Sequence, residues 1–271
     1  MALMDEFKEE RASIKKENFK TQFLYFWEYY KWYVIGPILA IAFIIYYIYT
    51  SVNAKDTAFY AAMLNTTEYN PLINEKLGVE KPTLFDHEND FIKYIDLNED
   101  EYRVMFDTSM RIHDDPEEKE TSEGIEKLMT YLGAGEIDIL VTGAADFADY
   151  AYDSHFYDLR EIMTQEQLTK YEPYLYYVDG RIVEEVKVAM DNMDYSYQLV
   201  VPDPTNPDAM EDPIPVGIYV HDSEYLLDTL IFEDSKVAMG IYANAPHIET
   251  ALLYLDFLLD LPYEEAAKLA E

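Results

Sequence analysis

Residues 32–49 read WYVIGPILAIAFIIYYIY, and this stretch without a charged side chain decides how the chain is organised. At about 1.5 Å of rise per helical residue it extends over roughly 27 Å, close to the hydrocarbon thickness of a bilayer. Aromatic side chains gather at both of its ends, as amphipathic rings do at the two membrane interfaces. The alternative is a buried core helix, but helices of soluble proteins rarely lack a polar face over such a length. The sequence therefore predicts a transmembrane helix over residues 32–53.

Basic side chains flank this segment unequally. Only Lys55 follows it closely, whereas the preceding residues include Lys8, Arg11, Lys15, Lys16, Lys20 and Lys31. Because positive flanks stay in the cytoplasm, residues 1–31 are expected to be cytoplasmic and residues 54–271 extracellular. The sequence thus predicts a single-pass protein of the cell membrane.

A cleaved signal peptide is the competing interpretation. The small residues up to Ala54 would suit a signal peptidase. However, the polar lead of about 31 residues and the long apolar run both exceed those of ordinary signal peptides. An uncleaved signal-anchor is favoured, and cleavage after Ala54 stays open.

The segment before the membrane helix carries large apolar side chains at helical spacing. They are Phe19, Phe23, Phe26, Trp27 and Tyr30. With the nearby lysines they favour an amphipathic helix, capped by Ser13, that lies on the inner membrane surface and contacts the lipid bilayer. The alternative is simple continuation of the membrane helix, with Gly36 and Pro37 as a site for a kink. Gly36 and Ala40 form a single pair of small residues, a weak signal for a membrane-protein partner.

The composition excludes several classes of protein. Asp and Glu number 54 against 20 for Lys and Arg, a net charge of −34, and residues 1–53 are neutral, so residues 54–271 hold all of it. Such a surface repels phosphate backbones and excludes nucleic acid as a partner. The apolar fraction of 49% argues against disorder. The absence of cysteine excludes disulfides, thiol nucleophiles, cysteine-ligated metals and a lipid-modified cysteine.

Strand and helix patterns alternate over residues 54–271, which predicts an α/β domain with a mixed sheet. Strands are expected at 58–64, 102–106, 137–141, 197–201, 216–220 and 237–242. Helices are expected at 124–132 between Ser122 and Gly133, from 144 to 151, at 165–171, at 248–259 and after Pro262. Asp179 and Gly180 predict the turn of a hairpin over 174–188. The proline-rich residues 202–215 predict an irregular connection between lobes.

Two stretches carry a resemblance to a known family. Residues 132–159 contain GAGEIDILVTG followed by FADYAYDSHFYDL, and residues 236–259 read KVAMGIYANAPHIETALLYLDFLL. In this order the chain resembles the extracellular solute-binding proteins of bacterial importers, which have two α/β lobes. The resemblance implies a trimmed two-lobed domain, because residues 54–271 are fewer than typical members have. A helix stands in place of the usual lipid-modified cysteine.

The resemblance also implies a ligand site. Ligands of open α/β sheets bind beyond the carboxyl ends of the strands. The polar residues expected there are Asn65, Thr66, Thr142, Gly143, Asp146 and Asn244. They would orient a small polar ligand, and the alternative for each is an ordinary cap or turn.

Patterns for catalysis and metal binding are missing from the sequence. The five histidines are scattered, and no nucleophile or phosphate-loop motif occurs. The run from Asp96 to Asp100 departs from a calcium loop because Glu101 replaces the glycine. No catalytic residue, metal or cofactor is therefore predicted.

The sequence predicts a non-catalytic, membrane-anchored binding or scaffold protein, an accessory component of a cell-surface complex. One alternative is a solute receptor that delivers a small polar ligand to an ABC-type importer. Another is a surface hydrolase with paired carboxylates.

Overall fold

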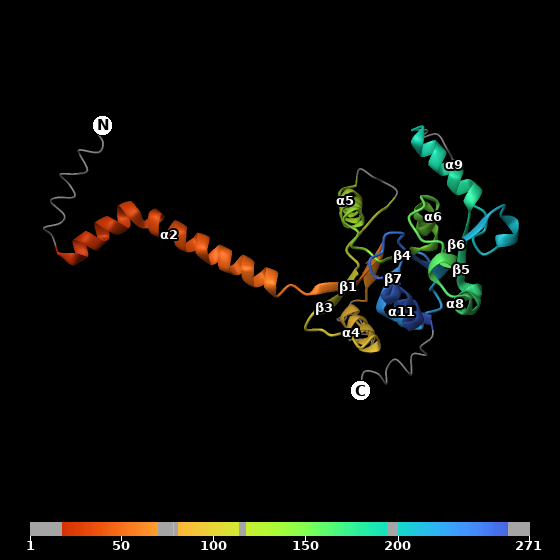
Figure 1. Cartoon of the computed structure of the whole chain (residues 1–271), viewed down its shortest axis with the longest axis horizontal. Helices are drawn as coiled ribbons and strands as arrows, with labels where there is room; N and C mark the ends of the chain where they lie inside the picture. The colour runs from red at the N-terminus through yellow and green to blue at the C-terminus, as the bar shows by residue number, and fades with distance from the viewer. Residues whose placement is uncertain (1–17, 70–77, 79–80, 114–117, 194–199, 260–271) are drawn as a thin grey trace. The chain divides into compact units, whose positions relative to one another are not determined.

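The chain divides after Lys55 into two compact units. The computed structural model describes residues 18–69, 78, 81–113, 118–193 and 200–259 (Figure 1). The N-terminal unit is described first and the unit of residues 56–271, called the α/β domain, afterwards.

The helix α2 (Phe19–Val52) makes up the described part of the N-terminal unit. The Asn18 side chain caps it by accepting a hydrogen bond from the Thr21 amide at 3.0 Å. The helix continues through Pro37. The segment expected at the membrane surface and the membrane segment therefore form one helix, which agrees with the continuation alternative. The predicted cap Ser13 lies outside the described residues.

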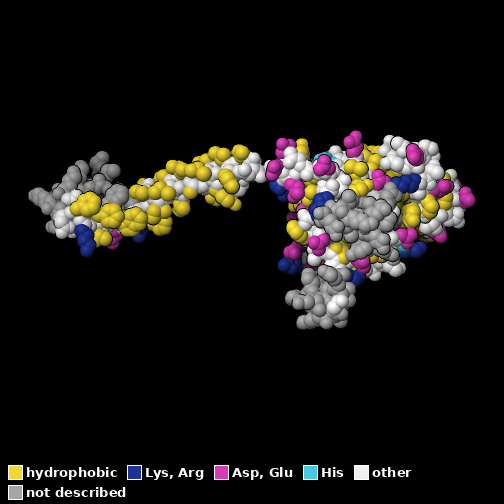
Figure 2. All heavy atoms as spheres, turned by 90° about the horizontal axis from the view of Figure 1, so that it is seen from below, with side chains coloured by type: hydrophobic (Ala, Val, Ile, Leu, Met, Phe, Trp, Pro, Cys, Tyr) yellow, Lys and Arg dark blue, Asp and Glu magenta, His cyan; other side chains and the backbone are white. Residues whose placement is uncertain are grey.

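Residues 31–52 of α2 are apolar and long enough to cross a membrane. None of this stretch is buried inside the structure, and Figure 2 shows hydrophobic side chains along it. The core helix of a soluble protein would be mostly buried, so this finding favours the membrane-spanning interpretation.

Six strands form the main sheet of the α/β domain. In spatial order they are β3 (Tyr102–Asp107), β1 (Asp56–Met63), β4 (Ile139–Gly143), β8 (Val237–Ile241), β6 (Pro213–Tyr219) and β5 (Leu175–Asp179). The strands β3, β1 and β4 are parallel, whereas β8, β6 and β5 each pair antiparallel with the preceding neighbour. The predicted mixed sheet is confirmed. A separate antiparallel pair joins β2 (Thr66–Glu68) to β7 (Leu230–Phe232).

Helices connect these strands. They are α4 (Leu84–Tyr94), α5 (Lys119–Ala134), α6 (Ala144–Tyr152), α7 (Leu159–Ile162), α8 (Gln165–Tyr171), α9 (Gly180–Asp191), α10 (Glu224–Thr229) and α11 (Ile248–Leu259), with the short 3₁₀ helices η1 (Glu172–Tyr174) and η2 (Pro207–Ala209). The helix predicted at 165–171 is confirmed with its bounds, and the helix predicted from Ile248 is confirmed over the described residues, which end at Leu259.

Neighbouring residues of β1 show that helices cover both faces of the sheet. The Phe59 ring packs against Tyr254 of α11 at 5.1 Å and against Phe91 of α4 at 5.3 Å. The Tyr60 ring packs against Tyr131 of α5 at 5.3 Å. Because successive strand residues point to opposite faces, α5 lies on the face opposite α4 and α11. The domain therefore has three layers, as Figure 1 shows.

Two glycines make room for aromatic packing over the central strands. Phe147 and Phe156 stack with ring centroids 4.8 Å apart. A Cβ atom on Gly217 would lie 2.6 Å from the Phe147 ring, and one on Gly240 would lie 2.7 Å from the Phe156 ring. Larger residues in β6 and β8 would displace these rings.

Gly240→Ala is therefore expected to lower the free energy of unfolding by about 1–3 kcal/mol, as overpacking a core does. Gly133→Ala is the matched control, because Gly133 lies within α5 with open space around its Cα. This substitution should stabilise the helix by about 0.5–1 kcal/mol. Urea unfolding of the full chain in mild detergent measures both, and equal effects of the two substitutions would contradict the packing argument.

Several sequence predictions were wrong. The hairpin over 174–188 does not form, because Asp179 ends β5 and its side chain caps α9 by accepting from the Arg181 amide at 3.0 Å. Ser122 is not the cap of α5, which begins after Glu118, and the helix ends at Gly135, where φ is +66°, rather than at Gly133. Residues 200–201 form no strand, while the rest of the strand expected at 197–201 and the helix expected after Pro262 lie outside the described residues.

The α/β domain forms one compact unit with a single main sheet over its described residues. The two-lobed arrangement implied by the resemblance is not confirmed.

Candidate functional site

The parallel strands β3, β1 and β4 end at one edge of the sheet, here called the carboxyl edge. Five of the six predicted site residues lie at this edge, because they follow or end β1 and β4. They are Asn65, Thr66, Thr142, Gly143 and Asp146.

Asn65 links two other segments at this edge through its side chain. Its φ is +50°, a conformation that asparagine tolerates better than most residues. Its side-chain amide donates to the Ile112 carbonyl at 2.6 Å and to Asp146 Oδ2 at 2.8 Å, while its oxygen accepts from the Ile112 amide at 2.8 Å. The polar atoms of Asn65 are thus engaged inside the protein.

The two threonines are fully buried. Thr66 donates its hydroxyl hydrogen to the Ile231 carbonyl at 2.9 Å, which links β2 to β7. The Arg111 guanidinium donates to the Thr66 carbonyl and to Thr67 Oγ1. The Thr142 hydroxyl is buried without a hydrogen-bond partner among the described residues. Neither threonine presents a hydroxyl to solvent.

The N-terminus of α6 is also occupied. Gly143 caps it, and the next amides donate to the Lys236 carbonyl at 2.8 Å and to Asp234 Oδ2 at 3.2 Å. The Gly143 backbone is so close to Asp234 that a Cβ there would lie 2.7 Å from the Asp234 Cβ. Since helix N-termini attract anions, Asp234 acts as an internal anion for this one.

Asn244 does not join the other five residues. It follows β8, which pairs antiparallel with β4, so the end of β8 lies beside the start of β4. There the Asn244 amide donates to the Leu132 carbonyl at the end of α5, at 3.2 Å. The prediction was wrong on this point because strand direction could not be derived from the local pattern.

Sequence reasoning missed a polar cluster after β3. Lys127 Nζ lies 2.6 Å from both Asp107 Oδ2 and Ser109 Oγ, and the Tyr60 hydroxyl donates to Asp107 Oδ2 at 2.8 Å. Burial alone would raise the pKa of Asp107, but hydrogen bonds from Lys127, Ser109 and Tyr60 lower it. The cluster borders an open pocket of about 440 Å³.

The cluster joins a helix to the end of a strand. Lys127 of α5 forms an ion pair with Asp107, the last residue of β3, and the Lys127 side chain is 35% exposed. Lys127 also donates to Ser109 Oγ. The arrangement therefore ties α5 to β3.

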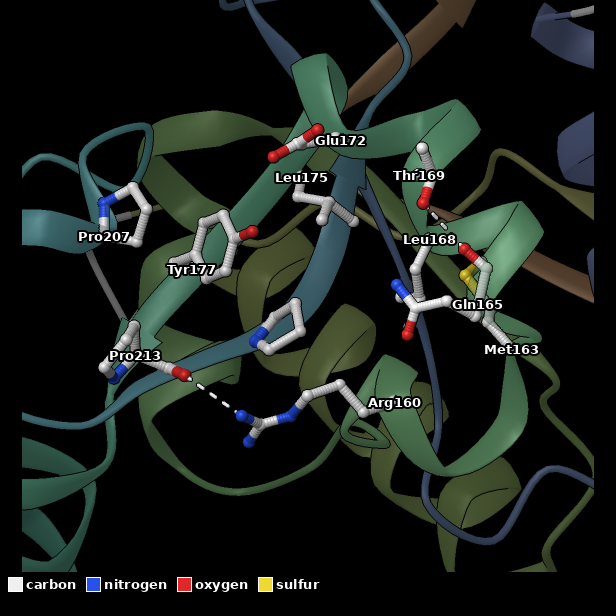
Figure 3. A pocket seen from close by; sticks show the side chains of 11 residues that line it. Arg160, Met163, Gln165, Leu168, Thr169, Glu172, Leu175, Tyr177, Pro207 and Pro213 are labelled. Atoms are coloured by element: carbon white, nitrogen blue, oxygen red, sulfur yellow. Dashed lines mark hydrogen bonds between the residues drawn. The ribbon is translucent and has the colours of Figure 1, made fainter.

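A larger groove, the proline groove, lies beside the edge strand β5 (Figure 3). It has a volume of about 650 Å³ and is formed by residues of α7, α8, β5 and the proline-rich segment, namely Arg160, Met163, Gln165, Leu168, Thr169, Glu172, Leu175, Tyr177, Pro207, Pro213 and Pro215. The sequence signal for it was the density of prolines in residues 202–215, which predicted only an irregular connection.

No group of three or more histidine, aspartate or glutamate side chains suited to a metal occurs among the residues that the structure describes. The chain matches no protein-family model, no curated protein and no solved structure.

Proposed function

We propose that this chain is a single-pass, membrane-anchored protein whose acidic α/β domain serves as a non-catalytic binding or scaffold component of a cell-surface complex. The observation that carries the proposal is the apolar stretch of residues 31–52 in α2, none of which is buried inside the structure. Unburied apolar surface of this extent is stable only in contact with lipid or with other apolar surface.

The carboxyl edge supports a scaffold over a solute receptor. Asn65, Thr66 and the N-terminus of α6 are all engaged in internal hydrogen bonds. A polar ligand at this edge would have to replace those bonds. The receptor for an importer, with a trimmed two-lobed solute-binding fold, is the second candidate, and the proline groove is where a ligand would find space.

The anchor is tested by placing charges at its centre. The double variant Ile41→Arg, Ile44→Arg should be lost from carbonate-washed membranes, because each arginine costs about 2.5–3.5 kcal/mol at the centre of a membrane helix. The control Ile41→Leu, Ile44→Leu should remain. Membrane retention of the arginine variant would contradict the spanning helix.

Orientation is tested with protease on intact cells that carry tags at both ends of the chain. The C-terminal tag should be removed and the N-terminal tag protected, because the basic flank precedes the helix. The opposite pattern would overturn the extracellular placement. Release from the membrane, before protease is added, of a fragment that carries the C-terminal tag and lacks the N-terminal tag would favour cleavage after Ala54.

A thermal-shift screen separates the two candidates. A solute receptor would gain about 2.7 kcal/mol of stability at a hundredfold excess of ligand over Kd. A scaffold should show no shift with sugars, amino acids or metals, and should instead co-purify with a protein partner from mild detergent.

A further inference from the structure

Rigid rings form much of the wall of the proline groove. Pro207, Pro213 and Tyr177 lie on one side, and Leu168 and Gln165 of α8 lie on the other (Figure 3). The groove is open to solvent rather than enclosed, so it suits a segment laid across the surface better than an enclosed small molecule. Flat rings and aliphatic side chains are what the prolines of a polyproline II helix contact.

The backbone beside the groove rules out a second mode of peptide binding, the addition of a strand to β5. The Leu175 amide donates to the Glu172 carbonyl, and the Tyr177 amide donates to the Pro204 carbonyl at 2.9 Å. An added strand would need these donors. A polyproline II segment makes no such ladder and can bind through side chains alone.

The charges at the groove favour a basic ligand. The single cation among the residues that line the groove is Arg160, which donates to Asp158 through Nε at 2.9 Å and through Nη2 at 2.6 Å. Asp158 and the nearby Asp212 both raise the pKa of Arg160. The Glu172 carboxylate at the rim has no ion pair among the described residues. A cation on the ligand would therefore meet an unbalanced negative field.

We propose that the proline groove binds an extended, proline-containing segment of a partner protein, with an arginine or lysine beside the prolines that pairs with Glu172. The inference rests on the proposed binding function and names the chemistry of its partner. A second copy of this chain is a poor occupant, because the net charge of −34 opposes close approach of two α/β domains. Gln165, whose side chain has no hydrogen bond among the described residues, is placed to bond a carbonyl of the bound segment.

The test measures fluorescence anisotropy of labelled synthetic peptides with the full chain in mild detergent. The probe alternates proline and leucine and ends in two arginines. One comparison peptide has glutamates in place of the arginines, and another has glycine and serine in place of the prolines. The probe should bind more tightly than both, and its binding should weaken with salt.

Two groove variants and one matched control complete the experiment. Glu172→Arg should weaken binding of the probe by about fivefold or more, since it turns an attraction into a repulsion. Tyr177→Ala should weaken it by about tenfold, the usual effect of removing a central ring. Glu184→Arg changes the net charge equally on the exposed face of α9 and should leave binding within about twofold. Near-UV circular dichroism verifies that each variant is folded.

Equal effects of Glu172→Arg and Glu184→Arg would overturn the groove proposal, because binding would then follow net charge alone. Equal binding of the proline-free peptide, or self-association that Tyr177→Ala abolishes, would also overturn it. If the Glu172→Arg chain still co-purifies with its partner, the scaffold function stands and only the groove assignment fails.

Discussion

Asp138→Ala is expected to destabilise the α/β domain by about 3–5 kcal/mol, because it leaves buried donors without an acceptor. Asp138 is fully buried just before β4. Its carboxylate accepts from the Tyr60 amide at 2.8 Å, from the His247 amide at 2.7 Å and from His247 Nδ1 at 3.1 Å. One side chain thereby joins β1, β4 and the segment that leads into α11.

The pKa of Asp138 reflects two opposing effects. Burial raises it, and the hydrogen bonds from Tyr60 and His247 partly counteract that rise. The loss on substitution therefore comes mainly from the buried amides of Tyr60 and His247, which would be left without a hydrogen-bond acceptor.

Asp203→Ala is the matched control for this prediction. Asp203 accepts two hydrogen bonds, from the Thr205 amide at 2.9 Å and the Thr205 hydroxyl at 2.8 Å, but unlike Asp138 it is exposed. Its removal should cost no more than about 1 kcal/mol. Urea unfolding can be followed by the near-UV signal of the tyrosines, since both tryptophans lie in α2. Similar losses for both variants would contradict the network.

The stability of the α/β domain is expected to fall by up to about 5 kcal/mol between pH 6.5 and pH 3 because of His87 alone. Burial lowers the pKa of His87 from 6.5 to about 3. Below pH 6.5 the unfolded chain takes up a proton on this residue and the folded chain does not. Acid therefore favours the unfolded state throughout this window, by about 1.4 kcal/mol for each pH unit.

The surroundings of His87 explain why it stays neutral. Its ring stacks on Tyr225 at 5.0 Å and meets the edges of Phe106 and Phe257. Nε2 lies 2.8 Å from the Tyr254 hydroxyl, and Nδ1 has no partner among the described residues. The Tyr225 hydroxyl, which belongs to the ring stacked on His87, donates to Asp90 Oδ2.

The double variant His87→Phe, Tyr254→Phe removes the titrating ring together with the hydroxyl that would otherwise lose its partner. The difference in unfolding free energy between the native chain and this variant should shift steadily in favour of the variant from pH 6.5 down to pH 4. A pH-independent difference for the double variant would show that His87 does not titrate as argued.

Local sequence patterns accounted for much of the secondary structure. The apolar residues of α11 recur at helical spacing, and this local pattern predicted the helix. The strands β1 and β4 were evident from short apolar runs. Asp179 shows the limit of such reasoning, because the same residue type starts turns and caps helices.

The candidate site depended more on tertiary structure. Asn65 and Asp146 follow different strands, and the parallel pairing of β1 with β4 brings them within 2.8 Å. Asn244 is carried to the other edge by the opposite direction of β8. The sequence of β8 gave no indication of its direction, because a buried strand has the same apolar residues whether it runs parallel or antiparallel to its neighbour.

By itself the sequence determined the membrane-length apolar segment, the negative charge of residues 54–271 and the alternation of strands and helices, because each depends on neighbouring residues or on composition. Only the tertiary structure decided that Asp138 meets Tyr60 and His247, which are 78 and 109 positions away, and that Tyr177 and Pro207 share a groove. Contacts between distant residues follow from how the whole sheet pairs and packs, and no local pattern encodes that pairing.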